Sequence, residues 1–264
     1  MRMTQTSLVL KKTLGQHILH DKNIVRKVAA AVKPQSGEVV VEIGGGTGVL
    51  TEQLAFEPIT IFVIELDKQF VEILTEKFFN RKNITIISGD ILKLHLFDSI
   101  PLNTKAVITG NLPYNITSPL LFHLFDQRDY IERMVFMVQR EVAHRITAQP
   151  GIKDRSLLSV ICQFHTEPQV LFPVSNNCFY PKPKVESAVV ELKLKQLPGG
   201  ISPGNFFKVV KTAFGKRRKM LKNSLADIAG EKIAQLGEVF NLNHRPEELT
   251  VEEFVHITNE LYPL

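Results

Sequence analysis

Hydrophobic positions alternate between short unbroken runs and longer segments with helical spacing, from about residue 22 to residue 194. Unbroken runs are typical of strands buried on both faces of a sheet, and spaced segments predict amphipathic helices. We expect strands at 39–43, 60–65, 84–88, 105–109, 133–138 and 186–194, and helices at 21–32, 68–79 and 141–148, with another running through Leu54. This alternation predicts a doubly wound α/β sheet with parallel strands and helices on both faces.

The pattern changes after Leu194. Residues 196–204 contain three glycines and two prolines, a composition typical of a linker. Beyond them we expect only helices, at 206–214, 219–229, 231–239 and 252–261. The sequence therefore predicts one domain over residues 1–195 and a small all-α domain over 196–264.

Composition narrows the class of protein. The chain has 264 residues, 44% of them hydrophobic, which is enough for a full core and excludes intrinsic disorder. Cys162 and Cys178 stand apart from each other and from any His/Cys cluster, so neither a disulfide framework nor a metal site is predicted. No signal-peptide core or membrane-spanning run is visible. We expect a cytoplasmic protein without a membrane partner.

The formal net charge of +5 is unevenly distributed. Residues 1–20 contain three bases and residues 192–226 contain nine, with no acid in either stretch, so the rest of the chain is net acidic. Such clustering predicts a face that binds a polyanion such as RNA, the alternative being a solvated helix face. We expect the contacts from Lys11, Lys12, Lys208, Lys211, Lys216, Arg217, Arg218, Lys219 and Lys222.

A glycine-rich turn follows the first predicted strand. Gly44, Gly46 and Gly48 form a G-x-G-x-G pattern, which lets backbone N–H groups approach a ligand. The dinucleotide fingerprint fails because Val49 occupies its last position, and the phosphate-binding P-loop lacks its Gly-Lys-Ser/Thr. A tight turn without a ligand is the alternative.

Two carboxylates follow at the ends of the next two strands. Glu65 is placed to accept hydrogen bonds from a ribose diol, and Asp90 to accept one from an adenine amine. A turn and two carboxylates describe a nucleoside pocket without a pyrophosphate site. S-adenosylmethionine fits this pocket better than a dinucleotide does.

The run Asn111-Leu112-Pro113-Tyr114 ends the fourth predicted strand. Methylation of an adenine amine is difficult because its nitrogen lone pair is delocalised into the ring. The Asn111 side-chain oxygen and the Leu112 carbonyl can accept the two N–H groups and localise that lone pair. Pro113 holds Leu112 extended, and Tyr114 offers a stacking face for an extruded base. The alternative is an Asn-x-Pro turn with a buried tyrosine.

A second aromatic candidate is Phe179, in a proline-rich loop before the last strand. It could close the other face of the adenine opposite Tyr114, or be an ordinary core residue. The sequence leaves both readings open.

These residues together resemble a known family, the KsgA/Dim small-subunit ribosomal RNA adenine dimethyltransferases. The resemblance covers nearly the whole chain and runs through Lys11–Leu19, Val41–Gly44, Ile64–Asp67, Gly110–Tyr114, Val138–Ala143, Phe179–Ser187 and Phe214–Lys219. It implies a Rossmann-like, class I S-adenosylmethionine-dependent methyltransferase domain followed by a helical RNA-binding domain. The cofactor contacts that it implies are His17, Leu19, Gly44, Glu65, Asp90 and Asn111.

The reaction implied by the resemblance is transfer of four methyl groups to two adjacent adenines near the 3′ end of small-subunit (16S) RNA, during ribosome biogenesis. The partner would be the assembling small subunit, and a monomer is the default state. The chain departs from the family at His17, where many members have Asn, at Gly45, where Pro is common, and at 154–156, where a Tyr-Gly pair is frequent.

Three alternatives stay open at this point. An Erm-type enzyme, which methylates a large-subunit adenine and gives macrolide resistance, looks similar through the α/β domain, although Phe214–Leu225 favours the small-subunit family. A non-enzymatic RNA-binding factor of the same fold would not need an intact Asn111–Tyr114 run. A small-molecule methyltransferase would not need nine clustered bases.

Overall fold

The computed structural model describes residues 10, 16–98, 100, 105–113, 116–216 and 219–263. Five residues with predicted roles lie outside the described residues, namely Lys11, Lys12, Tyr114, Arg217 and Arg218.

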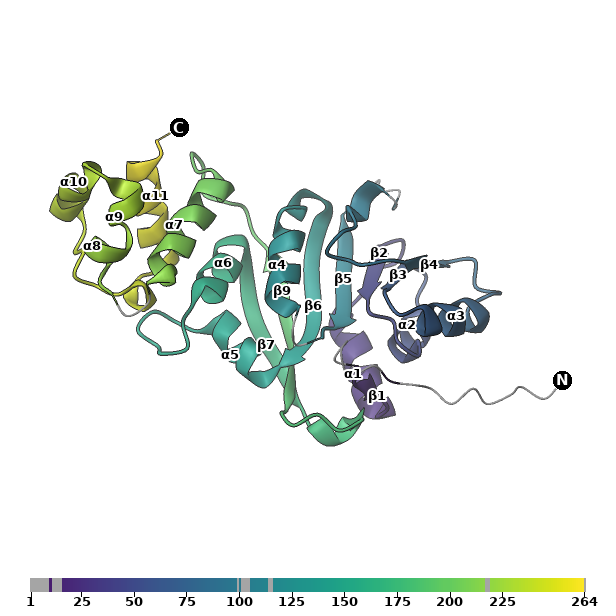
Figure 1. The fold of residues 1–264 in the computed structure, drawn as a ribbon. Helices are drawn as coiled ribbons and strands as arrows, with labels where there is room; N and C mark the ends of the chain where they lie inside the picture. Colours follow the sequence, from purple (N-terminus) through teal and green to yellow (C-terminus); the bar gives the residue numbers. More distant parts are fainter. Residues whose placement is uncertain are drawn as a thin grey trace.

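A seven-stranded sheet forms the centre of the molecule (Figure 1). In spatial order its strands are β4 (Ile84–Ser88), β3 (Thr60–Glu65), β2 (Val39–Ile43), β5 (Ala106–Asn111), β6 (Ile131–Gln139), β9 (Ser187–Leu194) and β7 (Thr166–Val174). The first five pair in parallel, and β9 is antiparallel to both β6 and β7. The strand order reverses between β2 and β5.

Helices cover both faces of this sheet because neighbouring side chains of each strand point to opposite sides. The helices of this part are α1 (Lys22–Val32), α2 (Val49–Leu54), α3 (Lys68–Lys77), α4 (Thr117–Phe125), α5 (Arg140–Thr147) and α6 (Leu157–His165). Val40 belongs to the hydrophobic cluster that includes residues of α1, α2 and α3, whereas Val41 belongs to the cluster that includes residues of α4, α5 and α6. Short 3₁₀ helices lie at Leu96–Asp98, Arg128–Tyr130, Asn176–Cys178 and Pro246–Glu248.

The doubly wound α/β sheet predicted from the sequence is therefore confirmed, with an addition at one edge. The strands predicted at 39–43, 60–65 and 84–88 form with those bounds. The antiparallel edge strand β7 and the helices α4 and α6 were not predicted. β7 contains Pro168 and Pro173, which are tolerated in an edge strand but mask its pattern.

A separate two-stranded ladder lies beside the main sheet. In it β1 (Ile18–Leu19) pairs antiparallel with β8 (Phe179–Tyr180), so that Ile18 stands opposite Tyr180 and Leu19 opposite Phe179. The ladder brings the start of the described chain to the loop that precedes β9.

The C-terminal part is helical, as predicted, and packs against the sheet domain. Its helices are α7 (Pro203–Gly215), α8 (Leu221–Ser224), α9 (Ala226–Ala229), α10 (Lys232–Val239) and α11 (Val251–Leu261). Phe206 of α7 stacks on Phe164 of α6 with ring centroids 3.8 Å apart, and one hydrophobic cluster runs from the sheet into these helices. A division of the chain into two domains after residue 195 stays a prediction.

The single helix predicted over 219–229 is instead two short helices, α8 and α9. The buried Ser224 ends α8, and its hydroxyl donates to the Leu221 carbonyl at 3.3 Å. Such local side-chain to backbone bonds compete with the regular helix and bend it.

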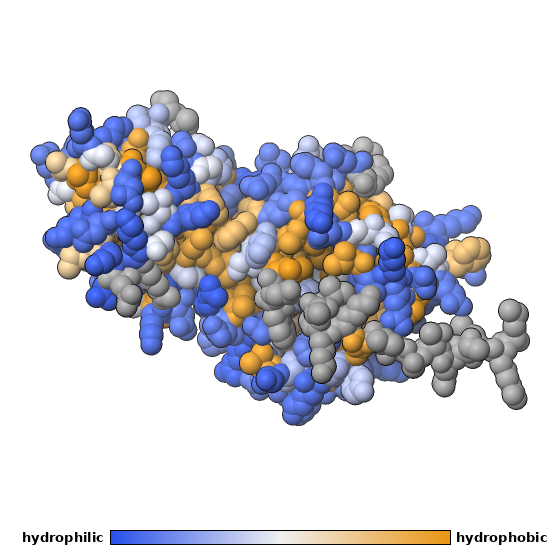
Figure 2. Space-filling model, viewed as in Figure 1, coloured by the Kyte–Doolittle hydropathy of each residue, from blue (hydrophilic) through white to orange (hydrophobic). Residues whose placement is uncertain are grey.

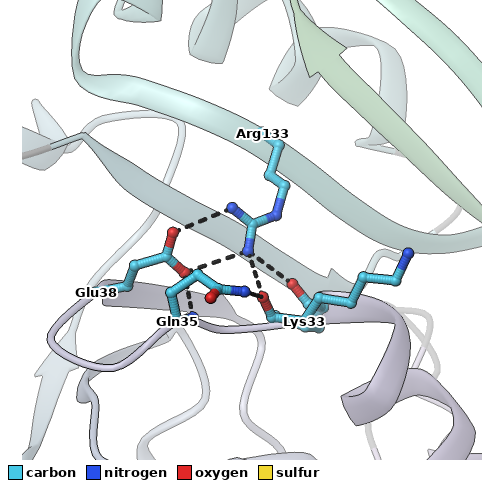
Figure 3. A network of polar contacts seen from close by, with 5 residues as sticks. Lys33, Gln35, Glu38 and Arg133 are labelled. Carbon is cyan, nitrogen blue, oxygen red and sulfur yellow. Dashed lines mark hydrogen bonds and ion pairs between the residues drawn. The ribbon is translucent and has the colours of Figure 1, made fainter.

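At the edge of the sheet where β2 and β6 begin, Arg133 joins three segments (Figure 3). Its guanidinium donates to both carboxylate oxygens of Glu38 at 3.2 Å and to the carbonyls of Val32 and Lys33 at 3.0 and 2.8 Å. These carbonyls lie at the C-terminal end of α1, where backbone carbonyls have no hydrogen-bond partner within the helix. Arg133 therefore fastens the end of α1 to the sheet.

Candidate active site

A cleft lies at the carboxyl ends of the parallel strands, between β2 and β5, where the strand order of the sheet reverses. This switch point is where doubly wound sheets bind ligands. Every residue predicted to contact a cofactor lines the cleft, namely His17, Leu19, Gly44, Gly46, Glu65, Asp90 and Asn111. Leu112 and Pro113 line it as well. The roles of these residues stay predictions, but the fold brings them to one place.

The glycine turn between β2 and α2 forms one wall of the cleft. Gly44, Gly46 and Gly48 have φ angles of 76°, 53° and 73°, in the left-handed region that favours glycine. The Gly44 amide donates to the Ile64 carbonyl at 2.8 Å, which ties the turn to the end of β3.

Glu65, the last residue of β3, is held against this turn. Its two carboxylate oxygens accept the amides of Gly46 at 2.9 Å and Asp67 at 2.8 Å. A carboxylate has about four lone-pair positions, so each oxygen can accept one further hydrogen bond. The side chain is only 7% exposed, and its geometry is therefore fixed before any ligand arrives.

The described lining residues make the cleft acidic. They include Glu42, Glu65 and Asp90 but neither lysine nor arginine. Asp90 is held at the end of β4 by the Leu92 amide, which donates to its Oδ1 at 3.1 Å. The carboxylates of Glu65 and Asp90 favour a cationic ligand and disfavour the phosphates of a dinucleotide.

Glu42 is a lining residue that the sequence reasoning missed. It is the fourth residue of β2, is 2% exposed, and accepts a hydrogen bond from the Thr51 hydroxyl. Burial, together with the nearby Glu65 charge, raises the pKa of Glu42 to about 8, although the bond from Thr51 opposes this rise. The signal in the sequence was a carboxylate inside an otherwise apolar strand.

Asn111, the last residue of β5, has an oriented side chain. Its Nδ2 donates to the backbone carbonyl of His17 at 3.1 Å, which leaves the amide oxygen as the acceptor. The next residue, Leu112, is anchored by its amide, which donates to the Met137 carbonyl at 3.0 Å. The Pro113 carbonyl accepts from the Ile116 amide at 3.2 Å. Asn111 therefore presents an acceptor, beside a backbone that is fixed on both sides.

His17 contributes its backbone to Asn111 and its side chain to a different segment. Its Nδ1 donates to the Pro181 carbonyl at 2.7 Å, in the turn after β8. Leu19 is 6% exposed and packs with Phe179 in the hydrophobic cluster on this face.

Phe179 lies in this cluster and is not among the described residues that line the cleft. Its side chain is 3% exposed. The structure thus shows its packing role, and the predicted stacking on an adenine stays a prediction.

Five of the lysines predicted to contact RNA are described, and they lie on the C-terminal helices or the segment between them, away from the cleft. Lys208, Lys211, Lys216, Lys219 and Lys222 are all exposed, and Figure 2 shows hydrophilic side chains covering much of this end of the molecule. Asp227, the first acid after the acid-free stretch, forms an ion pair with Lys216 at 2.8 Å. Four of these five lysines form no ion pair within the described residues.

The described residues contain no group of three or more His, Cys, Asp or Glu side chains placed to hold a metal ion. No described helix is long and apolar enough to cross a bilayer. Cys162 and Cys178 are both free thiols.

Two solved structures resemble the whole fold. A dimethyladenosine transferase from Plasmodium falciparum matches with a TM-score of 0.77 and 24% identity, over 93% of this chain and 96% of that chain. The 23S rRNA methyltransferase ErmE matches with a TM-score of 0.70 and 23% identity, over 92% and 98%. At these identities the likeness shows the fold, which is that of class I methyltransferases.

Sequence comparison is more specific. A protein of Coxiella burnetii named ribosomal RNA small subunit methyltransferase A is 42% identical over 254 residues, which cover 96% of this chain and 98% of its own. A protein of the same name from Desulfitobacterium hafniense is 42% identical over 253 residues, covering 94% and 90%. The family model described as ribosomal RNA adenine dimethylase matches residues 8–262. The chain therefore belongs to the ribosomal RNA adenine dimethylase family.

Proposed function

We propose that this protein transfers methyl groups from S-adenosylmethionine to the exocyclic amines of two adjacent adenines near the 3′ end of small-subunit ribosomal RNA. Family membership and the names of the relatives support the reaction class and the RNA. The observation that carries the chemistry is the oriented Asn111 side chain at the carboxyl end of β5.

Asn111 acts by accepting one N–H of the target amine at its Oδ1, while the neighbouring Leu112 carbonyl accepts the other. Two acceptors aimed at the two N–H groups draw the nitrogen toward tetrahedral geometry, which localises its lone pair on the line of attack. The hydrogen bond from Asn111 to the His17 carbonyl sets the side-chain orientation before the RNA binds, so no reorganisation is needed at the reacting centre.

The residues of the cleft fit the proposed cofactor. When bound, S-adenosylmethionine supplies an electrophilic methyl group on a positively charged sulfur. Glu65, held by the amides of Gly46 and Asp67, would bind the ribose hydroxyls, and Asp90 the adenine amine. Glu65 and Asp90, without a lysine or arginine among the described lining residues, suit a ligand that carries both a sulfonium and an ammonium group.

No residue of the cleft has to act as a general base. Each methyl transfer leaves the nitrogen with four bonds and a positive charge, and this cation is strongly acidic, so it releases its proton to water. Asn111 and the Leu112 carbonyl hold the amine in place without taking that proton. Methyl transfer by this chain therefore depends on positioning rather than on a titrating side chain.

The exposed lysines of α7 and the segment that follows would dock the RNA backbone on the assembling small subunit. Contacts of this kind supply affinity without reading base sequence. The choice of target adenines therefore falls to the cleft and its rim. The proposal includes a protein that acts as a monomer.

The experiment offers purified small and large ribosomal subunits, separately, to the protein with methyl-labelled cofactor. Subunits come from cells that lack this gene, so that their adenines are unmodified. We expect label in the small subunit only, and on adenine. Label confined to the large subunit would indicate an Erm-type enzyme, and no label in either subunit would indicate a non-enzymatic RNA-binding factor.

A further inference from the structure

The last residue of β8, where a turn begins, presents an exposed aromatic ring at the rim of the cleft. Phe179 points inward and Tyr180 outward, because neighbouring residues of a strand face opposite sides. Tyr180 is 69% exposed. It stands opposite Ile18 in the β1–β8 ladder, and Ile18 lines the cleft. The ring therefore lies next to the site without contributing to the core.

Two hydrogen bonds hold this turn, residues 180–184, which we call the Tyr180 turn. His17 Nδ1 donates to the Pro181 carbonyl at 2.7 Å, and Asn176 Nδ2 donates to the Pro183 carbonyl at 3.3 Å. Pro183 is itself buried. The backbone between the exposed side chains is therefore anchored to the same histidine whose carbonyl orients Asn111.

The Tyr180 turn also carries uncompensated positive charge. Lys182 and Lys184 are exposed, and neither takes part in an ion pair within the described residues. The acid that follows, Glu186, is already paired with Arg140 at 2.6 Å. Both lysines are therefore available to an anionic partner.

We propose that the Tyr180 turn binds unpaired RNA beside the target adenines, with a base stacked on Tyr180 and phosphates at Lys182 and Lys184. This inference rests on the proposed function. An exposed ring flanked by cations is how proteins hold single-stranded nucleic acid, since an unpaired base offers its π-face to the ring. A continuous double helix hides those faces in its stack, so the turn favours an unpaired stretch.

This surface is distinct from the basic segment of the C-terminal helices. In Figure 1 the turn lies at the lower edge of the molecule, next to β1, whereas α8, α9 and α10 lie at the far end of the C-terminal part. The RNA would thus be held at two places, by phosphate contacts at the C-terminal helices and by stacking at the rim of the cleft.

Three variants and two matched controls test the proposal. The variants are Tyr180→Ala, Tyr180→Phe, which keeps the ring, and the pair Lys182→Ala with Lys184→Ala. The aromatic control is Phe79→Ala, since Phe79 is 83% exposed after α3. The charge control is Lys82→Ala with Lys105→Ala. These two exposed lysines precede β4 and β5, at the amino ends of the strands and opposite the cleft. Thermal melting and cofactor affinity are measured for each variant, along with the KM for small-subunit particles and binding of a single-stranded RNA oligonucleotide.

We expect Tyr180→Ala to raise KM and weaken oligonucleotide binding at least about fivefold, and Tyr180→Phe to stay near the parent. The lysine pair should lower the salt slope of RNA binding by about 1.4, the figure for two phosphates of a single strand. Melting, cofactor affinity and kcat should stay at the parent's values. KM and salt slope equal to those of the controls would overturn the proposal, as would a loss confined to cofactor affinity. If the parent methylates no ribosomal subunit, the proposed function fails, and the oligonucleotide measurement still decides on the turn.

Discussion

The side-chain amide of Asn111 donates to the backbone carbonyl of His17 at 3.1 Å, across 94 residues of sequence. This contact links the end of β5 to the chain segment before β1. The amide nitrogen of Asn111 is thereby bound to the protein, and the amide oxygen is left to a substrate. The carbonyl of His17, rather than its ring, is thus the group that orients the proposed amine acceptor.

Asn111→Ala removes both that contact and the acceptor. We expect methyl transfer to fall by at least about 100- to 1,000-fold, the range for loss of one preorganised hydrogen-bonding group in an active site. Cofactor binding should largely survive, because Glu65 and Asp90 are untouched. Labelled methyl transfer gives the rate, and calorimetry the cofactor affinity.

Asn111→Asp is the informative companion, because a carboxylate keeps an acceptor but cannot donate to the His17 carbonyl. We therefore expect methyl transfer to fall in this variant too. Activity near the parent's in either variant would contradict the proposed amine geometry.

Glu42→Gln tests the protonation of the buried carboxyl. Its pKa is raised from 4.5 to about 8 by burial and by the Glu65 charge, so the folded protein keeps a proton that the unfolded chain releases. The contribution of Glu42 to stability is therefore fully present below pH 4.5 and is lost progressively up to about pH 8. Since glutamine cannot titrate, the free energy of unfolding of the variant should lack this decline.

Urea unfolding of parent and Glu42→Gln at several pH values between these limits measures the effect. The difference in unfolding free energy should shift in favour of the variant as the pH rises. A difference that does not change with pH would mean that Glu42 is ionised in the folded protein.

Arg133→Met should destabilise the protein by about 2–3 kcal/mol, since charged hydrogen bonds to Glu38 and to the end of α1 are lost. The pKa of Glu38 is lowered on balance: burial raises it, but the hydrogen bonds from Arg133 and the Gln35 amide outweigh burial. Stability from this group is present above the pKa of the unfolded chain and is lost as the pH falls through the folded pKa. Arg133→Met should therefore flatten the acid side of the stability profile.

Denaturant unfolding across the acid range checks this prediction. The matched control is Arg26→Met, an exposed arginine of α1 whose guanidinium donates to Lys22 and Asn23 of the same helix. Equal stabilities of the two variants would show that the network in Figure 3 contributes nothing measurable.

Neutralising Lys216, Arg217, Arg218 and Lys219 together should weaken binding to the small subunit and reduce its salt dependence. Each phosphate contact of a duplex contributes a slope of about 0.9, so four contacts would remove about 3.6. Lys216 already pairs with Asp227, and the measured change should therefore be smaller than that limit. Binding at several salt concentrations gives the slope, and an unchanged slope would show that these bases are only a solvated surface.

The sequence predicts the parallel half of the sheet well, because β2, β3 and β4 are mostly apolar runs bounded by polar or glycine positions. Prediction fails at α6 and β7. The helix lacks a polar stripe, with seven of its nine residues buried, and the strand contains two prolines at an edge. Local pattern does not separate a buried helix from a buried strand.

At the site, position along the strands was enough to place Glu65, Asp90 and Asn111 around one cleft. The orientation of Asn111 was not predictable, because its partner is a backbone carbonyl that carries no sequence signal. The role of Arg155, one of the departures from the family pattern, was not predictable either. This side chain is fully buried and donates to the backbone carbonyls of Leu249 and Ala148 at 3.0 and 2.7 Å. Such contacts depend on the folded chain.

The central claim, methylation of two adjacent small-subunit adenines by a mechanism that needs Asn111, is tested most directly by primer extension on ribosomal RNA. RNA is taken from cells in which the native gene is deleted and replaced by a copy that encodes either the parent protein or the Asn111→Ala variant. We predict stops at two adjacent adenines near the 3′ end of the small-subunit RNA with the parent, and none there with the variant. Identical patterns in the two strains, or stops only in large-subunit RNA, would contradict the account.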